Sequence, residues 1–209
     1  MGYVVFIDTE TTGLPPRGLP RDTVVTAQNA IQWNNCRLVQ LAWEIRYEPG
    51  SEPGDIATMP NRGDVVMKRS LIVIPEGFAI PEEAAAIHGI STQKAITSGQ
   101  LLSSTLEQLF ADIAQFNVTK AVAHNMSFDE NVLLAEMYKM ARLDMLAIWS
   151  GLTKVCTMCQ GTLPGQRWPK LPDLYERLCG VLPDELRANL HDATIDVHIC
   201  ADIYFALSV

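Results

Sequence analysis

The chain has 209 residues, of which 48% are hydrophobic and 19% are charged, and its formal net charge is −8. This length and composition predict one globular domain over residues 1–209, with enough apolar side chains for a core. The negative charge argues against a protein that coats long nucleic acid, because such binding depends mostly on Lys and Arg at phosphates. It does not exclude an enzyme that grips a few nucleotides in a cation-loaded cleft, since bound cations reverse the local charge.

Several further classes are disfavoured by sequence features. No apolar stretch reaches 18 residues, so we expect no membrane span. The N-terminus lacks the pattern of a secretory signal. Five scattered cysteines favour reduced thiols and a cytoplasmic location. Cys156 and Cys159 form a lone Cys-x-x-Cys, and a zinc knuckle would need a second pair at a suitable spacing.

The first expected strand is the apolar run Tyr3 to Ile7, which leads directly into Asp8 and Glu10. Side chains alternate along a strand, so the two carboxylates point to the same side, roughly 6 to 7 Å apart. Carboxylates on one side of a buried strand repel each other unless a cation lies between them, and Mg²⁺ and Mn²⁺ prefer oxygen ligands. An isolated Asp-x-Glu is more often the end of a strand, with both acids in water. Whether Asp8 and Glu10 bind a cation therefore depends on the other acids of the chain.

The later elements predict a mixed α/β architecture. Residues 15–35 are rich in Pro, Arg, Thr and Asn and predict a long loop, which in a compact domain is usually functional or mobile. Residues 152–167 give no assignable pattern. Strands followed by helices that alternate with a strand predict one mixed sheet flanked by helices. We expect strands at 37–47, 65–74 and 121–123, the first three strands of the chain forming an antiparallel meander, and helices at 81–89, 101–116, 127–140, 171–178 and 189–207.

Two more acids and a histidine lie near expected helix starts. Asp129 falls in the first turn of helix 127–140, where the helix dipole favours a carboxylate, and Ser127 with Glu130 has the spacing of a capping box. His191 and Asp196 are ~140° apart on a regular helix. They can face one site only if His191 lies at the helix edge and Asp196 within it. Taken alone, Asp129 is equally a plain helix-start acid, and His191 is more often a surface or capping residue.

Together these residues resemble the DnaQ-like 3′–5′ exonucleases, the DEDD family in its histidine subclass. The matching segments are Asp8-x-Glu10, then Asn125-x-x-Phe128-Asp129, then His191-x4-Asp196, in the order of the family and over nearly the whole chain. Many members have Asp-Thr after the helix of the second motif, whereas this chain has Cys156-Thr157 at that place.

The resemblance implies a ribonuclease-H-like fold, a five-stranded mixed sheet with helices on both faces, as a single exonuclease domain. It also implies that two divalent metal ions, Mg²⁺ or Mn²⁺, are held by Asp8, Glu10, Asp129 and Asp196, with His191 as the general base. The product would be a nucleoside 5′-monophosphate released from a 3′ end.

The same resemblance implies how substrate is held. Thr11 and Thr12 would contact the terminal nucleotide and its 3′-OH, Leu14 would wedge against a base, and Asn125 would support the substrate phosphate. From the residues alone, Thr11 and Thr12 could equally form a strand-end turn, and Leu14 could be a core residue. The expected partners are single-stranded nucleic acid 3′ ends, with a DNA polymerase as a candidate, and no membrane.

Three alternatives stay open at this point. An exoribonuclease that trims short RNA would use the same metals. A scaffold or binding subunit would keep the fold without activity, although all five expected catalytic positions are filled. A metal-free glycosidase using Asp8 and Glu10 would leave Asp129, His191 and Asp196 without a role.

Overall fold

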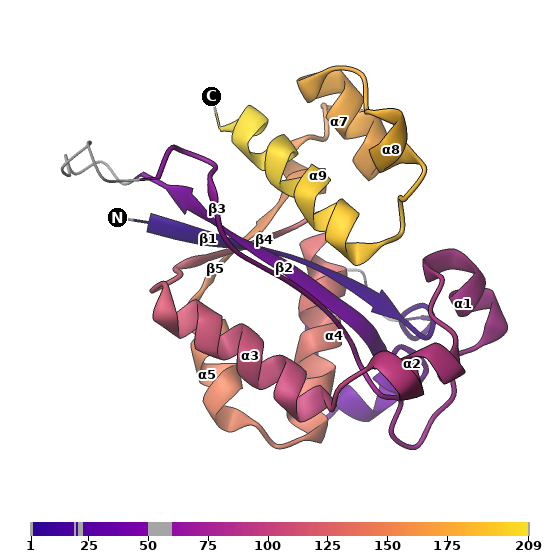
Figure 1. Ribbon diagram of the computed structural model, residues 1–209. Helices are drawn as coiled ribbons and strands as arrows, with labels where there is room; N and C mark the ends of the chain where they lie inside the picture. The colour runs from indigo at the N-terminus through magenta and orange to yellow at the C-terminus, as the bar shows by residue number, and fades with distance from the viewer. Residues whose placement is uncertain (1, 19, 21–22, 50–59, 209) are drawn as a thin grey trace.

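The computed structural model describes residues 2–18, 20, 23–49 and 60–208, so part of the expected loop 15–35 lies outside the described residues. Its centre is a five-stranded mixed sheet in the order β3-β2-β1-β4-β5 (Figure 1). β1 is antiparallel to β2, and β2 to β3, which confirms the expected meander; β4 is parallel to β1 and to β5. The strands are β1 Gly2–Thr11, β2 Leu38–Glu48, β3 Val65–Ile72, β4 Lys120–Ala123 and β5 Thr153–Cys156.

Helices cover both faces of this sheet, as expected for the ribonuclease-H-like fold (Figure 1). Alternate side chains of β1 separate the two layers: Val5 and Ile7 pack in the core with α3, α4 and α5, whereas Val4 and Phe6 pack against α9. The helices are α1 Glu82–His88, α2 Thr92–Ser98, α3 Leu102–Gln115, α4 Met126–Lys139, α5 Leu143–Gly151, α6 Thr157–Gln160, α7 Leu171–Cys179, α8 Asp184–Arg187 and α9 Ala193–Leu207, with the 3-10 helix η1 at Ala30–Asn35.

The sequence pattern missed or misplaced several of these elements. The expected loop 15–35 ends in η1, and the unassigned stretch 152–167 contains β5 and α6. The capping box at Ser127 and Glu130 is wrong. Asn125 precedes α4 with a left-handed backbone (φ 74°), so the helix begins earlier and Ser127 lies inside it. The chain needs this sharp turn because it leaves β4 and enters the helix at once.

The end of β1 extends beyond its parallel neighbour. The pairing of β1 with β4 ends at Phe6 and Val122, whereas the pairing with β2 continues to Thr11. Asp8 and Glu10 therefore lie past the carboxyl end of β4, where the chain turns into α4. Open α/β sheets usually bind ligands at this edge.

No helix among the described residues combines the length and apolar character needed to cross a bilayer.

Candidate active site

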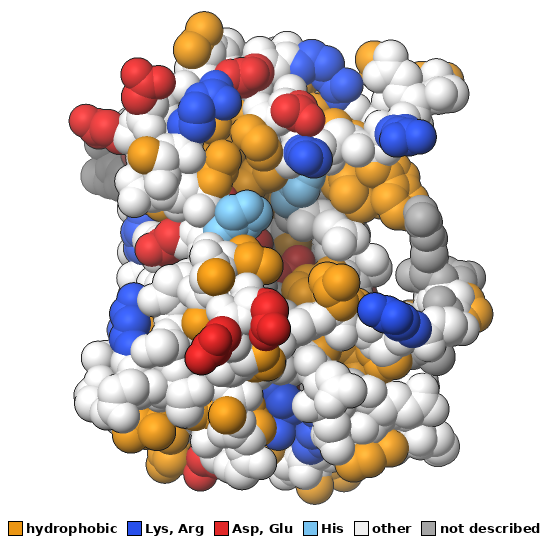
Figure 2. All heavy atoms as spheres, turned by 90° about the vertical axis from the view of Figure 1, so that its right-hand side faces the viewer, with side chains coloured by type: hydrophobic (Ala, Val, Ile, Leu, Met, Phe, Trp, Pro, Cys, Tyr) orange, Lys and Arg blue, Asp and Glu red, His pale blue; other side chains and the backbone are white. Residues whose placement is uncertain are grey.

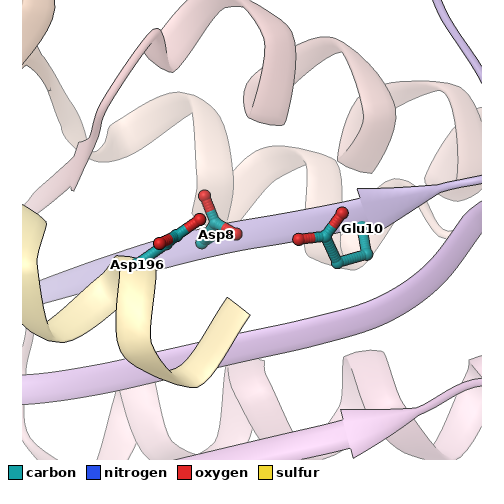
Figure 3. A group of neighbouring side chains, drawn as sticks. All are labelled: Asp8, Glu10 and Asp196. Carbon is teal, nitrogen blue, oxygen red and sulfur yellow. The ribbon is translucent and has the colours of Figure 1, made fainter. Parts of the chain in front are cut away.

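Three carboxylates from two distant elements converge at this edge of the sheet. Asp8 and Glu10 project from β1 on the side of α9, and Asp196 reaches them from the first turn of α9. Figure 3 shows the carboxylate of Asp196 beside that of Asp8, with the carboxylate of Glu10 turned toward both. One oxygen from each residue lies within 4.8 Å of the others, a spacing that a divalent cation could bridge.

Asp129 approaches the cluster from the opposite face of the sheet. It lies in the first turn of α4, as expected, and its side chain is buried. The hydroxyl of Thr9 donates a 2.8 Å hydrogen bond to Asp129 Oδ1. Asp129 is not part of the 4.8 Å group, although its charge contributes to the raised pKa of Asp8. The structure therefore places all four expected acids in one neighbourhood and brings three of them into immediate contact range.

The four acids disfavour one another's ionised forms. Burial, followed by the charges of Asp129, Asp196 and Glu10, raises the pKa of Asp8 well above its usual value. Burial is also the largest cause that raises the pKa of Glu10 to about 8, of Asp129 to about 7 and of Asp196 to about 6. No Lys or Arg among the described residues forms an ion pair with any of these four acids.

One oxygen of Asp196 is left without a partner. Asp196 Oδ1 is buried and makes no hydrogen bond, while Oδ2 accepts a 3.2 Å bond from the backbone N–H of His191. A buried carboxylate oxygen without a donor is costly and indicates a ligand that the site is built to hold. All-oxygen donors of this kind suit Mg²⁺ or Mn²⁺, so the residues fit the expected cations.

His191 lies outside α9, at the edge that the sequence analysis required. Its backbone is left-handed (φ 68°), which is uncommon for a residue with a side chain and is found more often at functional sites. Its side chain is exposed and lines a cavity of about 540 Å³ with Asp196, Asn125, His124 and Trp168. Figure 2 looks onto this face, where the histidine side chains lie beside a hollow bordered by hydrophobic and by Lys or Arg side chains.

The segment after Glu10 forms a turn and a second cavity of about 420 Å³. Thr11 Oγ1 donates to the carbonyl of Gly13, and Thr12 Oγ1 donates to the carbonyl of Asn35. Both hydroxyls therefore hold the turn, which is the structural alternative left open above. Leu14 is 83% exposed, so its interpretation as a core residue is wrong.

Two residues of this region were not among the expected site residues. Thr9 belongs to the site because it lies between the two acids but faces α4, a position that strand alternation alone would have indicated. His88 lines the same cavity as Leu14, is only 9% exposed, and its Nδ1 accepts a hydrogen bond from the backbone of Ile90. Burial lowers the pKa of His88.

The five cysteines are all free thiols. Cys156 Sγ accepts a hydrogen bond from the backbone of Cys159 at the start of α6.

Comparison with solved structures shows the fold of a known exonuclease. The chain is similar to Escherichia coli exonuclease I in three crystal structures: one described as suggesting how processivity is achieved (TM-score 0.64, 17% identity), a complex with a dA16 oligonucleotide (TM-score 0.63, 16% identity) and a complex with a dT13 oligonucleotide (TM-score 0.63, 19% identity). In each case the match covers 100% of this chain and 41% of the other. The chain thus spans about two fifths of the length of those proteins. No protein-family model matches the sequence, and no curated protein sequence matches it. The ribonuclease-H-like fold expected from the resemblance is confirmed.

Proposed function

We propose that this chain is a metal-dependent 3′–5′ exonuclease domain, which removes nucleotides from the 3′ end of single-stranded DNA as nucleoside 5′-monophosphates. The observation that carries the proposal is the convergence of Asp8, Glu10 and Asp196 at one edge of an exonuclease-type fold. Two of the structural neighbours are complexes with a dA16 and a dT13 oligonucleotide, which supports single-stranded DNA as the substrate class.

In this proposal Asp8, Glu10 and Asp196 would hold divalent cations, and Asp129 would contribute from α4. Two such cations would supply a lowered pKa for a water molecule and stabilisation of negative charge on the leaving 3′-oxygen. The raised pKa values of the acids mean that cation binding displaces protons, so affinity should increase with pH. The hydrogen bond from Thr9 keeps Oδ1 of Asp129 oriented.

His191 is the proposed general base. His191 lines the same cavity as Asp196, and its backbone N–H bonds the Asp196 carboxylate. From this position the imidazole would take a proton from water at the edge of the acidic cluster. The exposed location also allows the proton to pass on to solvent. The left-handed backbone of His191 is consistent with this role, because such a conformation is found more often at functional sites.

The cavity lined by residues 9–14 is the proposed site of the terminal nucleotide. Since the hydroxyls of Thr11 and Thr12 are engaged in the turn, contact with the 3′-OH is expected to come from the backbone of this segment. Leu14 is exposed above the cavity, where it can wedge against a base. Asn125, at the β4–α4 turn, lines the cavity that contains His191 and would support the phosphate.

The alternatives receive different support. An exoribonuclease would use the same acids, and substrate competition has to separate it from a DNA exonuclease. A metal-free glycosidase is disfavoured because Asp196 lies within 4.8 Å of Asp8 and Glu10, and because the charge of Asp129 also acts on Asp8. A polymerase partner and a cytoplasmic location stay predictions from the sequence.

The direct test uses 5′-labelled single-stranded DNA and RNA oligonucleotides with Mg²⁺ or Mn²⁺. We expect stepwise shortening from the 3′ end, DNA before RNA, and no reaction in EDTA. A circular single strand should stay intact. Activity that EDTA leaves unchanged, or cuts inside the circle, would reject the proposal.

A further inference from the structure

A third cavity, of about 260 Å³, adjoins the two described above. It shares Phe128 with the cavity proposed for the terminal nucleotide. It shares Asn125 and Trp168 with the cavity that contains His191 and Asp196. The space therefore lies next to both the site of bond cleavage and the site of the terminal nucleotide, where the preceding nucleotide of a bound strand would have to pass.

Trp33, one of the residues that line this cavity, carries a buried donor with no acceptor. Trp33, in η1, is 3% exposed, and its Nε1 has no hydrogen-bond partner among the described residues. Buried N–H groups are nearly always paired, so an unpaired one needs an explanation such as a missing ligand. The oxygen-rich rim of a nucleobase or its sugar would supply the acceptor.

A second aromatic residue that lines the cavity, Trp168, lies between two cations in the sequence. Trp168 is 50% exposed, and the neighbouring Arg167 and Lys170 are exposed and form none of the ion pairs found among the described residues. The segment is anchored, because His124 bonds the carbonyl of Pro169 through Nε2 (3.1 Å). An exposed aromatic ring flanked by cations is the usual means of binding a single strand, with stacking for the base and charge for the phosphates.

The segment Thr23 to Val25, of which Thr23 lines the cavity, is tied to α4, the helix that carries Asp129. Asn131 Oδ1 accepts a 2.8 Å hydrogen bond from the backbone of Val25, and its Nδ2 donates a 2.8 Å bond to the carbonyl of Thr23. Asn131 is itself buried. This segment is therefore positioned relative to the acids before any substrate arrives.

We propose that this third cavity is the subsite for the base of the penultimate nucleotide, which stacks on Trp168 and accepts a hydrogen bond from Trp33 Nε1. This inference rests on the proposed function and adds to it the residues that grip the strand on the 5′ side of the cut. Stacking tolerates any base, so the subsite would favour a strand over a mononucleotide without selecting sequence.

The first test compares two substrates in the Trp168→Ala variant. One is a single-stranded decanucleotide, and the other is the p-nitrophenyl ester of thymidine 5′-monophosphate, which has no penultimate nucleotide. We expect the ratio of kcat/KM for the oligonucleotide to kcat/KM for the ester to fall about 5- to 100-fold, the worth of one stacked base. The Trp168→Phe variant should recover most of the ratio, and Leu143→Ala, an exposed apolar change on α5, should not alter it. An equal loss on both substrates would overturn the proposal.

The second test locates the stacked base by binding alone. Fluorescence anisotropy is measured with 5′-fluorescein oligonucleotides whose terminal linkages are phosphorothioates, which hardly react. An abasic residue at the second position from the 3′ end should weaken binding to wild type as much as Trp168→Ala does, and should cost nothing further in that variant. An abasic residue at the sixth position is the control. Additive losses would show that Trp168 does not stack on the penultimate base.

A third variant, Trp33→Phe, removes the indole N–H together with part of the ring. The loss of the hydrogen bond should weaken oligonucleotide binding about 2- to 10-fold, and this loss should disappear for the oligonucleotide that is abasic at the second position. Unchanged binding would remove Trp33 from the subsite. Binding that depends on Trp168 without cleavage would refute the proposed function but support this subsite. Cleavage that Trp168→Ala leaves unchanged would support the proposed function but refute this subsite. A wild-type chain that binds no oligonucleotide would refute both proposals.

Discussion

Thr9 Oγ1 donates a 2.8 Å hydrogen bond to Asp129 Oδ1, joining the middle of the first acidic motif to the acid of the second. Both side chains are buried. This bond is the largest of the effects that lower the pKa of Asp129, against the larger effect of burial, which raises it to about 7. Thr9 thus helps Asp129 to ionise, although its own side chain faces away from the cluster of Asp8 and Glu10.

Replacing Thr9 by Val should therefore weaken metal binding without touching an acid. The change removes the hydroxyl at nearly constant volume, takes away its hydrogen bond to Asp129 Oδ1 and raises the pKa of Asp129 further. We expect Mn²⁺ affinity at pH 7 to fall about 10-fold, the lower range for losing a partner of a metal ligand, and to recover partly at pH 8.5. Calorimetric titration with Mn²⁺ measures this, with Thr9→Ser as the matched control. Equal affinity in wild type and Thr9→Val would show that Asp129 binds no metal.

His191→Ala tests the proposed general base. Removing a general base usually lowers the rate about 10²- to 10⁴-fold. Metal binding should survive because the four acids remain and because the backbone N–H of His191, which bonds Asp196, is kept in the variant. Oligonucleotide hydrolysis and Mn²⁺ titration are measured on the same preparation. Loss of metal binding would instead make His191 a ligand.

The sequence predicted the parts of this site that show as local patterns. The apolar run before Asp8 places both acids on one side of β1, and the five-residue step from His191 to Asp196 requires the helix edge that the structure has. The amphipathic pattern of the helix expected at 101–116 is equally clear. Its spaced apolar residues are all buried in α3: Leu102, Leu106, Leu109, Phe110 and Ile113.

What the sequence could not predict depends on neighbours in space. α5 is apolar almost all round, so it has no polar face to mark its period, and α2 is short with only Ala95 buried. β5 is an edge strand whose side chains do not alternate between buried and exposed. The bond from Thr9 to Asp129, 120 residues apart, requires the packing of α4 under β1. The left-handed Asn125 that replaces the expected Ser127 cap follows from the tight β4–α4 turn.

The metal-free protein should lose stability as the pH rises. Glu10, Asp129 and Asp196 have folded pKa values of about 8, 7 and 6 against ordinary values of 4.5, 3.8 and 3.8. The folded state therefore holds more protons than the unfolded state between about pH 4 and pH 8. Its free energy of unfolding falls with increasing pH in that window.

Urea unfolding in EDTA between pH 5 and pH 8.5 measures this effect. The lower pH limit leaves out the titration of Glu44. Although burial opposes it, hydrogen bonds and charges from His198, Arg46 and Lys68 lower the pKa of Glu44 to about 2. Glu44 therefore changes the stability in the opposite sense, and only below this pH range. Saturating Mn²⁺ should remove the slope, since bound cations compensate the carboxylate charges. A metal-free protein whose stability is constant over this range would contradict the packing of the acids.

Asp8→Asn tests both charge repulsion in the metal-free protein and metal binding. Asp8 is surrounded by Asp129, Asp196 and Glu10, and together with burial they raise its pKa. At pH 8 the variant lacks one of these mutually repelling charges at nearly constant volume. We therefore expect metal-free Asp8→Asn to unfold with a free energy on the order of 1 kcal/mol above metal-free wild type, within the usual range for one substitution. At pH 5 the gain should shrink, because the cluster is then largely protonated in both proteins.

Addition of Mn²⁺ should reverse this order. A ligand that binds only the folded state stabilises it, so the wild-type melting temperature should rise with metal concentration. Asp8→Asn should gain far less, because an amide oxygen replaces a carboxylate at the centre of the group within 4.8 Å. The two melting curves, plotted against Mn²⁺ concentration at pH 8, should cross, and oligonucleotide hydrolysis by the variant should fall by several orders of magnitude. Nearly parallel curves with activity intact would mean that Asp8 neither binds metal nor repels its neighbours, which would reject the metal-site interpretation of β1 and with it the proposed function.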